Sequence, residues 1–240
     1  MERYSIIKEK NPREIVLLRG SGCRWKRCTF CDYHLDRCDN QEENFILNRG
    51  ELKKVTGLYS RLEVINSGSF CDLDEKTMDL IAEVCREKEI KYLHFESHWM
   101  HRKEVPIIRE KFAEIGVQII IKTGVETFDI DYREKVMKKG FGNATPEEIS
   151  HYADEVCLLF GLSGQTQESM EKDIETGLQY FDRVCVNIMN ENSTQVKPDN
   201  DVINVFGKNI APKYIDNNRV DILMDNLDFG IGDKVQEAFK

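Results

Sequence analysis

Residues 14–32 read EIVLLRGSGCRWKRCTFCD, a short apolar run followed at once by a loop that contains three cysteines. The run EIVLL has the length and the aliphatic character of a buried β-strand. The loop places Cys23, Cys28 and Cys31 within nine positions of one another. A disulfide framework requires an even number of cysteines, and a closed structural zinc site requires four protein ligands. What three clustered thiols bind is therefore the question that decides the function.

The alternation of strand and helix continues along the chain. Further β-rich runs occur at about residues 62–66, 92–96, 117–122, 155–160 and 183–188. Apolar residues recur at helical spacing between them, on the faces Met78, Ile81, Ala82 and Cys85; Val105, Ile108, Phe112 and Ile115; and Met170, Ile174, Leu178 and Phe181. Apolar strands that alternate with amphipathic helices indicate a parallel sheet covered by helices.

This pattern gives about six β/α units, whereas a closed barrel needs eight. We therefore predict an α/β fold, a partial and open β/α barrel with its core at about residues 13–190. A loop-rich C-terminal segment at about residues 191–240 would close the barrel mouth, and the whole of residues 1–240 would form a single domain. A doubly wound sheet is the alternative that periodicity leaves open. In either fold the site belongs at the C-terminal ends of the strands.

The composition limits the classes of function. The chain has 240 residues, of which 40% are hydrophobic and 32% charged, as in soluble globular proteins. A net charge of -9 disfavours a nucleic-acid partner, and no apolar run is long enough to span a membrane. The N-terminus lacks an apolar signal core, so we expect a cytoplasmic protein whose eight cysteines are thiols or metal ligands.

Three interpretations of the cysteine loop compete. A zinc ion would take Cys23, Cys28, Cys31 and a fourth ligand from His34 or Cys38. Incidental thiols are improbable in so dense a cluster. A [4Fe-4S] cluster would use the three thiolates and leave one iron open for a ligand that reacts there.

The loop resembles that of the radical S-adenosylmethionine enzymes, in which an aromatic residue precedes the last cysteine, as Phe30 precedes Cys31 here. The usual family spacing is three and two residues, whereas this chain has four and two. The segments GVETFD at residues 124–129 and FGLSGQT at residues 160–166 are similar to two further cofactor-binding turns of that family. The resemblance implies a [4Fe-4S] cluster on the three cysteines and S-adenosylmethionine bound to it. The cofactor would be cleaved to a 5′-deoxyadenosyl radical that abstracts hydrogen from the substrate.

The resemblance also implies residues that contact the cofactor. Glu126 would bind its ribose or methionine part, and the family's Gly-Gly-Glu type turn is replaced here by NSGSF at residues 66–70, without the carboxylate. Lys122 would meet the cofactor carboxylate, with a solvated lysine as the alternative. The full expected set is Phe30, Tyr33, Ser67, Gly68, Ser69, Lys122, Glu126, Leu162 and Asn187.

Four further residues are candidates for catalysis or substrate contact. Glu96 and His98 follow the third predicted strand, where they would face the site, and surface positions are the alternative. Asp225 and Asp228 lie in the C-terminal segment and would present carboxylates to an amine, and a packing tail is the alternative.

The cysteine loop, the chain length and the segment DNLDFGIG at residues 225–232 resemble the queuine lyases of bacterial queuosine salvage. The resemblance implies cleavage of the C–N bond of queuine, a deazapurine base, with release of 7-aminomethyl-7-deazaguanine. It implies an electron donor such as flavodoxin or ferredoxin, and a homodimer is an open expectation. Two alternatives stay open, a radical enzyme acting on another deazaguanine or on tRNA, as in archaeosine formation, and a zinc-binding interaction module.

Overall fold

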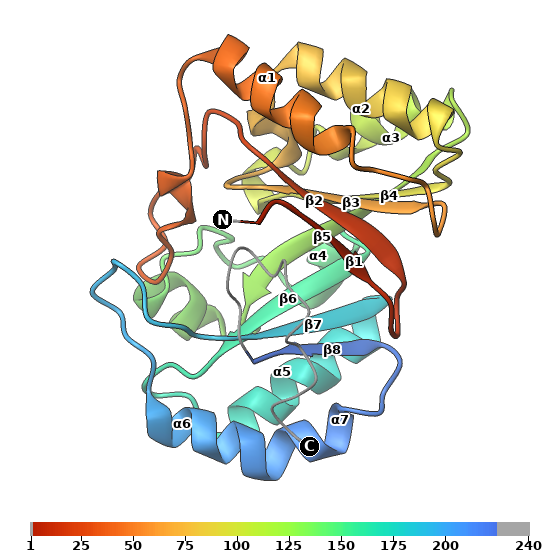
Figure 1. Cartoon of the computed structure of the whole chain (residues 1–240). Helices are drawn as coiled ribbons and strands as arrows, with labels where there is room; N and C mark the ends of the chain where they lie inside the picture. Colours follow the sequence, from red (N-terminus) through yellow and green to blue (C-terminus); the bar gives the residue numbers. More distant parts are fainter. Residues whose placement is uncertain (1, 225–240) are drawn as a thin grey trace. The chain divides into compact units, whose positions relative to one another are not determined.

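The computed structural model of the protein describes residues 2–224 (Figure 1). These residues form two compact units. The first unit contains residues 2–26 and 33–122, and the second contains residues 27–32 and 123–224. The cysteine loop therefore contributes to both units, and the expectation of a single domain stays a prediction.

The described residues contain eight strands whose order in the sheet follows the chain from β1 to β8. They are β1 (Tyr4–Ile7), β2 (Arg13–Leu18), β3 (Arg61–Asn66), β4 (Tyr92–Glu96), β5 (Gln118–Glu126), β6 (Glu155–Phe160), β7 (Arg183–Ile188) and β8 (Val220–Leu223). β1 pairs antiparallel with β2, whereas β2 to β5 and β6 to β8 pair in parallel. A sequential order without reversal is that of β/α barrels and differs from the doubly wound order. The predicted α/β partial-barrel class is thus confirmed.

Helices alternate with the parallel strands as predicted. They are α1 (Gln41–Leu52), α2 (Glu75–Glu87), α3 (Val105–Ala113), α4 (Pro146–Ser150), α5 (Gln167–Tyr180), α6 (Asn200–Val205) and α7 (Ala211–Tyr214). Short 3-10 turns occur at Tyr33–Leu35, Phe70–Asp72 and Trp99–His101, and π-helical turns at Tyr132–Val136 and Phe206–Ile210. No helix within residues 2–224 is long and apolar enough to cross a membrane.

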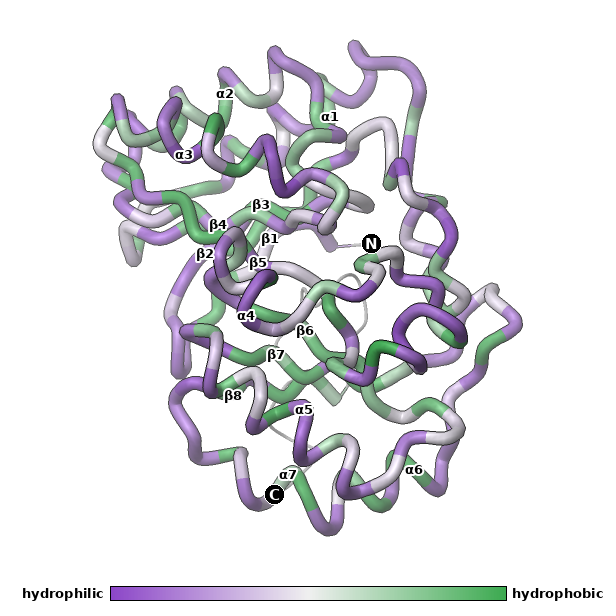
Figure 2. The backbone as a smooth tube through the Cα atoms, turned by 180° about the vertical axis from the view of Figure 1, so that it is seen from behind, coloured by the Kyte–Doolittle hydropathy of each residue, from purple (hydrophilic) through white to green (hydrophobic). Residues whose placement is uncertain are grey.

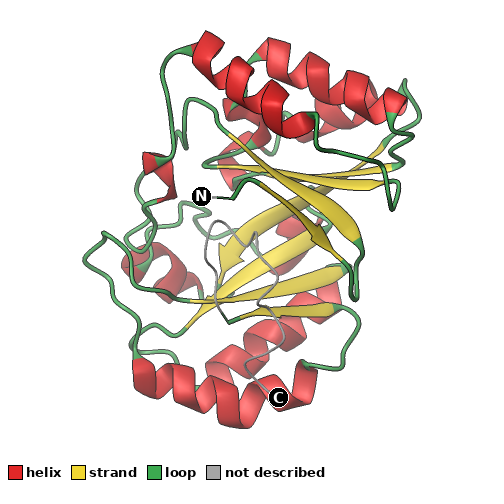
Figure 3. Ribbon diagram, in the orientation of Figure 1, coloured by secondary structure: helices red, strands yellow, loops and turns green. Residues whose placement is uncertain are grey.

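In the first unit, α1, α2 and α3 form a layer on one face of β2, β3 and β4 (Figure 3). The strand side chains alternate between this layer and the opposite face. Phe95 packs against Phe112 of α3 with the ring centroids 6.0 Å apart, so Phe95 faces the helices. His94 points the other way and is in register with Glu63 of β3. The face turned away from the helices therefore carries polar side chains in the middle of otherwise apolar strands.

In the second unit, α5 packs closely against the sheet. A Cβ atom on Gly177 would lie 2.7 Å from a methyl carbon of Val184, so only glycine permits this approach of helix to strand. Figure 2 shows apolar residues concentrated along β6 and β7 of this unit. The capping box of Thr166 fixes the start of α5 directly after the glycine-rich turn at residues 161–164. The turn that follows β6 is therefore held by both the strand and the helix.

The segment after residue 190 differs from the loop-rich expectation. It contains α6, α7, a π-helical turn and the strand β8 within its described part. Each of these elements has only four to six residues, too few for hydrophobic periodicity to show. Asp225 and Asp228 lie outside the described residues, as does the last part, residues 225–240, of the segment predicted to close the barrel mouth.

Candidate functional site

The first cysteine of the triplet belongs to the first unit, at the C-terminal ends of its strands. The backbone N–H of Cys23 donates to the carbonyl oxygen of Ser67, 3.2 Å away. Gly68 allows the turn after β3 to approach this closely, because a Cβ atom there would lie 2.9 Å from the Cα atom of Cys23. The predicted cofactor turn and the cysteine loop are thus in direct contact.

The other two cysteines belong to the second unit. Cys28 and Cys31 are half-buried and pack against a core cluster formed by Phe30, Met137, Leu159, Leu162 and Met189. The Thr29 N–H donates to the carbonyl of Met137 at 3.1 Å. The Thr29 hydroxyl donates to the Val136 carbonyl at 2.9 Å, so the loop is anchored to the residues that follow β5.

Two of the residues predicted to contact the cofactor lie together. Phe30 is 8% exposed and Leu162 is 2% exposed, and both belong to the same apolar cluster. The amide of Gln165 bridges the glycine-rich turn by accepting from the Leu162 N–H at 2.9 Å and donating to the carbonyl of Leu159 at 2.8 Å. Tyr33 is 36% exposed and belongs to the first unit. The structure therefore joins Phe30 with Leu162 and leaves Tyr33 at the surface of its own unit.

Glu126, predicted to bind the cofactor, forms a largely buried ion pair that sequence reasoning did not anticipate. Its Oε1 lies 2.7 Å from the Nζ of Lys139. The backbone of Glu126 has a φ of 71°, in the left-handed region that non-glycine residues rarely adopt. A Cβ atom on Gly124 would lie 2.4 Å from Glu126 Oε1 and 3.1 Å from Lys139 Nζ, so glycine leaves the space in which the pair forms.

Lys139 also lies against the cysteine loop. Its Nζ is 5.6 Å from the centroid of the Phe30 ring. Burial alone would lower the pKa of Lys139. The Glu126 carboxylate and the Cys28 thiol outweigh burial, and Cys31 adds to their effect, so the pKa of Lys139 lies above its usual range. A buried cation is thus placed where it acts on two of the three clustered thiols.

The NSGS turn after β3 holds two buried hydroxyl groups. The Ser69 hydroxyl accepts from the backbone N–H of His98 at 2.9 Å, and the Ser69 N–H donates to Asp72 Oδ2 at 2.8 Å. Ser67 is 4% exposed, and its hydroxyl oxygen has no hydrogen-bond partner within residues 2–224. Buried hydroxyl groups in folded proteins are nearly always hydrogen-bonded, and a bound ligand would supply the partner that Ser67 lacks here. Asp72, which the sequence did not single out, supplies a carboxylate beside the turn.

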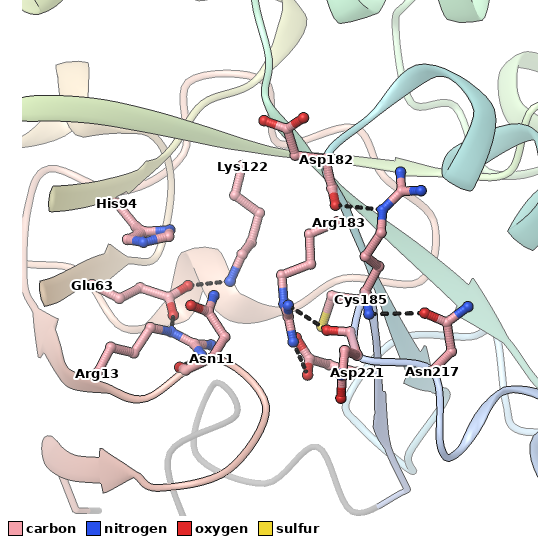
Figure 4. Close-up of polar contacts among 12 residues, drawn as sticks. Asn11, Arg13, Glu63, His94, Lys122, Asp182, Arg183, Cys185, Asn217 and Asp221 are labelled. Carbon is pink, nitrogen blue, oxygen red and sulfur yellow. Dashed lines mark hydrogen bonds and ion pairs between the residues drawn. The ribbon is translucent and has the colours of Figure 1, made fainter. Parts of the chain in front are cut away.

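Lys122 lies in a buried charge network on the face of the first unit that is turned away from the helices. Figure 4 shows the Glu63 carboxylate between the Nζ of Lys122 and the guanidinium of Arg13, and it forms ion pairs with both. Burial alone would raise the pKa of Glu63. The charges of Arg13 and Lys122 outweigh burial, so the pKa of this carboxyl lies well below its usual range. The structure thus gives Lys122 a protein partner in the strand layer.

The two predicted residues after β4 have different environments. Glu96 is half-buried at the end of β4 and is in register with Lys122 of β5. His98 stacks on the ring of Trp25, with centroids 5.3 Å apart and an interplanar angle of 21°. Its Nδ1 accepts from the Met100 N–H at 3.2 Å, which caps the next 3-10 turn. His98 is therefore fixed between the cysteine loop and the loop after β4.

Asn187 lies on β7 of the second unit, where it is half-buried. Its Oδ1 is 3.9 Å from the Sγ of Cys185, two residues earlier on the same face of the strand. Further along that face, the Arg183 guanidinium forms a bidentate ion pair with Asp221 of β8, with N–O distances of 2.7 and 2.8 Å (Figure 4). The Asn187 side chain thus lies near the C-terminal end of β7, whereas the Arg183–Asp221 ion pair lies at the start of this strand.

Sequence reasoning missed Glu63, Asp72 and Lys139. A charged residue within the apolar run LEVIN was a usable signal for Glu63, because a buried strand rarely carries an unpaired carboxylate. Lys139 carried no such signal, since it stands in the polar stretch KVMKKG. No group of three or more His, Cys, Asp or Glu side chains arranged to hold a metal ion occurs among residues 2–224.

The chain was compared with protein families, curated proteins and solved structures. No protein-family model matches the chain, and no curated protein matches it. Among solved structures, the chain is similar to a queuine lyase from Clostridium spiroforme bound to S-adenosylmethionine (SAM) and queuine. The two are 43% identical in sequence, the match covers 97% of this chain and 100% of that chain, and the TM-score is 0.91. Together with the three-cysteine loop and the sequential strand order, this similarity shows that the chain belongs to the queuine lyase family of radical S-adenosylmethionine enzymes.

Proposed function

We propose that this protein is a queuine lyase that uses S-adenosylmethionine and a [4Fe-4S] cluster to cleave the C–N bond of queuine and release 7-aminomethyl-7-deazaguanine. The observation that carries the proposal is the 43% identity, over 97% of the chain, to a queuine lyase whose structure contains both SAM and queuine. Such identity over the full length supports a shared substrate as well as a shared fold. The cysteine triplet supports the same chemistry independently.

The residues present fit the cluster. Cys23, Cys28 and Cys31 are half-buried and would be its three protein ligands. Thiolates are the usual ligands of such clusters, and the buried ammonium of Lys139 offsets part of their negative charge. When bound, the reduced cluster would supply one electron for the cleavage of S-adenosylmethionine into methionine and the 5′-deoxyadenosyl radical that would abstract hydrogen from queuine.

The remaining cofactor contacts are assigned by chemistry. The buried Ser67 hydroxyl would accept a hydrogen bond from the methionine ammonium, aided by the close backbone approach that Gly68 permits. Glu126, held by Lys139, would accept from the ribose hydroxyls. The other proposed contacts are Phe30, Tyr33 and Leu162 for the adenine, Ser69 for the turn, Lys122 for the carboxylate and Asn187 for the adenine or the base.

The substrate contacts are proposed from the same end of the strands. Glu96 would accept N–H donors of the guanine-like edge or of the secondary amine of queuine, since a carboxylate accepts and does not donate when ionised. His98, held by Trp25, would donate or accept near the diol. Asp225 and Asp228, which lie outside the described residues, would supply a second carboxylate to the amine.

The partners follow from the chemistry. A one-electron reductant such as flavodoxin or ferredoxin would reduce the cluster, and we propose that the protein forms a homodimer. The net charge of -9 favours the free base over tRNA, because tRNA binding relies on Lys and Arg contacts with phosphates.

The test is anaerobic reconstitution with iron and sulfide, followed by dithionite and S-adenosylmethionine with and without queuine. We expect a brown protein that forms 5′-deoxyadenosine and forms more of it when queuine is present. Cys28→Ala should lose the chromophore and the activity. Cys38→Ala is the matched control, because this half-buried loop thiol lies seven residues beyond Cys31 and belongs to the zinc interpretation only.

The outcomes separate the alternatives. A colourless protein that binds zinc and loses it in Cys38→Ala would contradict the radical chemistry. Formation of 5′-deoxyadenosine that responds to queuosine-containing tRNA and is indifferent to queuine would move the substrate to tRNA. A response to queuine alone, unchanged by tRNA, is the result that the proposal requires.

A further inference from the structure

The Lys139–Glu126 pair lies next to residues 27–32, the part of the cysteine loop that belongs to the second unit. Lys139 contacts Glu126 at 2.7 Å on one side and the Phe30 ring at 5.6 Å on the other. Thr29 ties the same loop to the backbone of Val136 and Met137, just before this lysine. The ammonium therefore lies beside Phe30 and close enough to Cys28 and Cys31 to interact with their charges.

Burying a lysine and a glutamate is costly, since both lose their hydration. Backbone geometry adds to this cost, because Glu126 has a positive φ and only glycine at position 124 leaves room for the pair. Strained and buried charges of this kind tend to occur at functional sites. The location of the pair against the cysteine loop indicates what that function is.

We propose that Lys139 is a positioning residue that sets the reduction potential of the cluster held by the cysteine loop and keeps Glu126 in place for the cofactor. The inference rests on the proposed function. Reduction adds one electron, and hence one negative charge, to the cluster, with the electron taken from the reductant and no bond broken. A nearby buried cation stabilises the reduced state and raises the potential, and a nearby anion lowers it.

Neither Lys122 nor Lys135 is placed as Lys139 is. Lys122 and Arg13 both form ion pairs with the carboxylate of Glu63, in the strand layer of the first unit. Lys135 lies four residues before Lys139 but pairs with Asp131 at the surface, where its side chain is 74% exposed. Water screens an exposed charge, so Lys135 provides a control of equal charge that should not affect the cluster.

The experiment is a redox titration of the reconstituted cluster, followed by electron paramagnetic resonance, in the full chain without S-adenosylmethionine. Lys139→Met leaves the Glu126 carboxylate beside the loop, and we expect the reduction equilibrium at a fixed potential to fall about tenfold, which is about 59 mV for one electron. Glu126→Gln should shift it in the opposite direction. The double variant Lys139→Met/Glu126→Gln should have a reduction potential close to that of the wild type. The same is expected of Lys139→Arg and Lys135→Met.

Two readouts distinguish this role from a merely structural one. A structural role would lower the thermal stability of Lys139→Met without changing the potential of the molecules that retain the cluster. If Lys139→Met does not fold, Glu126→Gln still tests the inference, because it keeps the lysine and must raise the potential. Equal potentials in the wild type and in Glu126→Gln would overturn the role of the pair.

The failure of this inference can be distinguished from the failure of the proposed function. If the wild type takes up no cluster, the proposed function is wrong and the inference falls with it. If the wild type cleaves queuine and all variants share one potential, only the role of Lys139 is overturned.

Discussion

Two lysine–glutamate pairs within residues 2–224, the buried Lys122–Glu63 pair of the first unit and the largely buried Lys139–Glu126 pair of the second, differ in what surrounds them. Lys122 and Glu63 lie in the strand layer of the first unit, where Arg13 adds a second cation. Lys139 and Glu126 lie against the cysteine loop in the second unit. The Glu63 carboxylate is paired with two protein cations, whereas Lys139 interacts with two cysteine thiols as well as with Glu126. The same two residue types thus lie within a sheet in one place and, as we propose, beside the cluster site in the other.

The largest effect on stability is expected at Glu63. Glu63→Gln leaves Arg13 and Lys122 as two buried cations without their shared anion, so the free energy of unfolding should fall by about 3–5 kcal/mol. Urea unfolding followed by circular dichroism measures this change. Glu51→Gln, which breaks the more exposed pair with Lys54, is the matched control and should change stability by about 0.5 kcal/mol or less. Equal losses in the two variants would show that the buried network does not stabilise the first unit.

Lys139→Met should lower the free energy of unfolding by about 3 kcal/mol, because it leaves the Glu126 carboxylate buried without its cation. Removing both charges in Lys139→Met/Glu126→Gln should recover most of this loss, since the uncompensated charge is then gone. Thermal and urea unfolding of the two variants give the comparison. A double variant as unstable as the single one would mean that packing of the lysine stem, and not charge, is what the site needs.

Lys122→Met should cost about 2 kcal/mol, less than Glu63→Gln, because Arg13 still neutralises Glu63. If Lys122 also meets the cofactor carboxylate, the dissociation constant of S-adenosylmethionine should rise about tenfold, which corresponds to about 1.4 kcal/mol. Equilibrium binding to the reconstituted enzyme measures this. A loss of stability with unchanged cofactor affinity would confine Lys122 to the strand layer.

Asp173 of α5 is a further buried carboxylate, held by hydrogen bonds instead of an ion pair. It accepts from the Phe128 N–H at 2.8 Å and from the Thr127 side chain. Burial raises the pKa of Asp173 to about 6, opposite in direction to Glu63. The folded state therefore binds the proton more tightly than the unfolded state, and the wild type loses stability as the pH rises through 6.

Asp173→Asn tests this difference through the pH dependence of stability. The amide retains an acceptor oxygen and does not titrate, so between pH 4 and pH 8 the variant should gain about 3 kcal/mol of stability relative to the wild type. The difference should vanish by about pH 4, where the wild-type carboxyl is protonated in the folded state. Urea midpoints measured across this range provide the test. A stability difference that does not depend on pH would mean that changed hydrogen bonds, and not the buried charge of Asp173, cause the difference between the variant and the wild type.

The sequence predicts most of the fold because the six parallel strands and the longer helices carry clear periodicity. The run LEVIN gives β3, and the spacing from Met170 to Phe181 gives α5. The four-residue strands β1 and β8 escape prediction because YSII and VDIL are too short to show a period. Pairing with β2 and β7 forms them, and that pairing depends on tertiary structure.

The candidate site is predictable to the extent that it follows strand ends. Cys28, Phe30 and Leu162 come together as the motif context suggests. Lys139 could not be predicted, because it follows a π-helical turn and reaches Glu126 only through the fold. Its importance depends on what it contacts and not on the residues next to it in the chain.

The most direct test of the central claim is the stoichiometry of the reaction. Reconstituted wild type, given queuine, S-adenosylmethionine and reductant under anaerobic conditions, is analysed by liquid chromatography and mass spectrometry. We predict that queuine is consumed and that 7-aminomethyl-7-deazaguanine appears in equal amount, with 5′-deoxyadenosine, while Cys28→Ala forms neither product. Formation of 5′-deoxyadenosine by the wild type with queuine left intact would contradict the account.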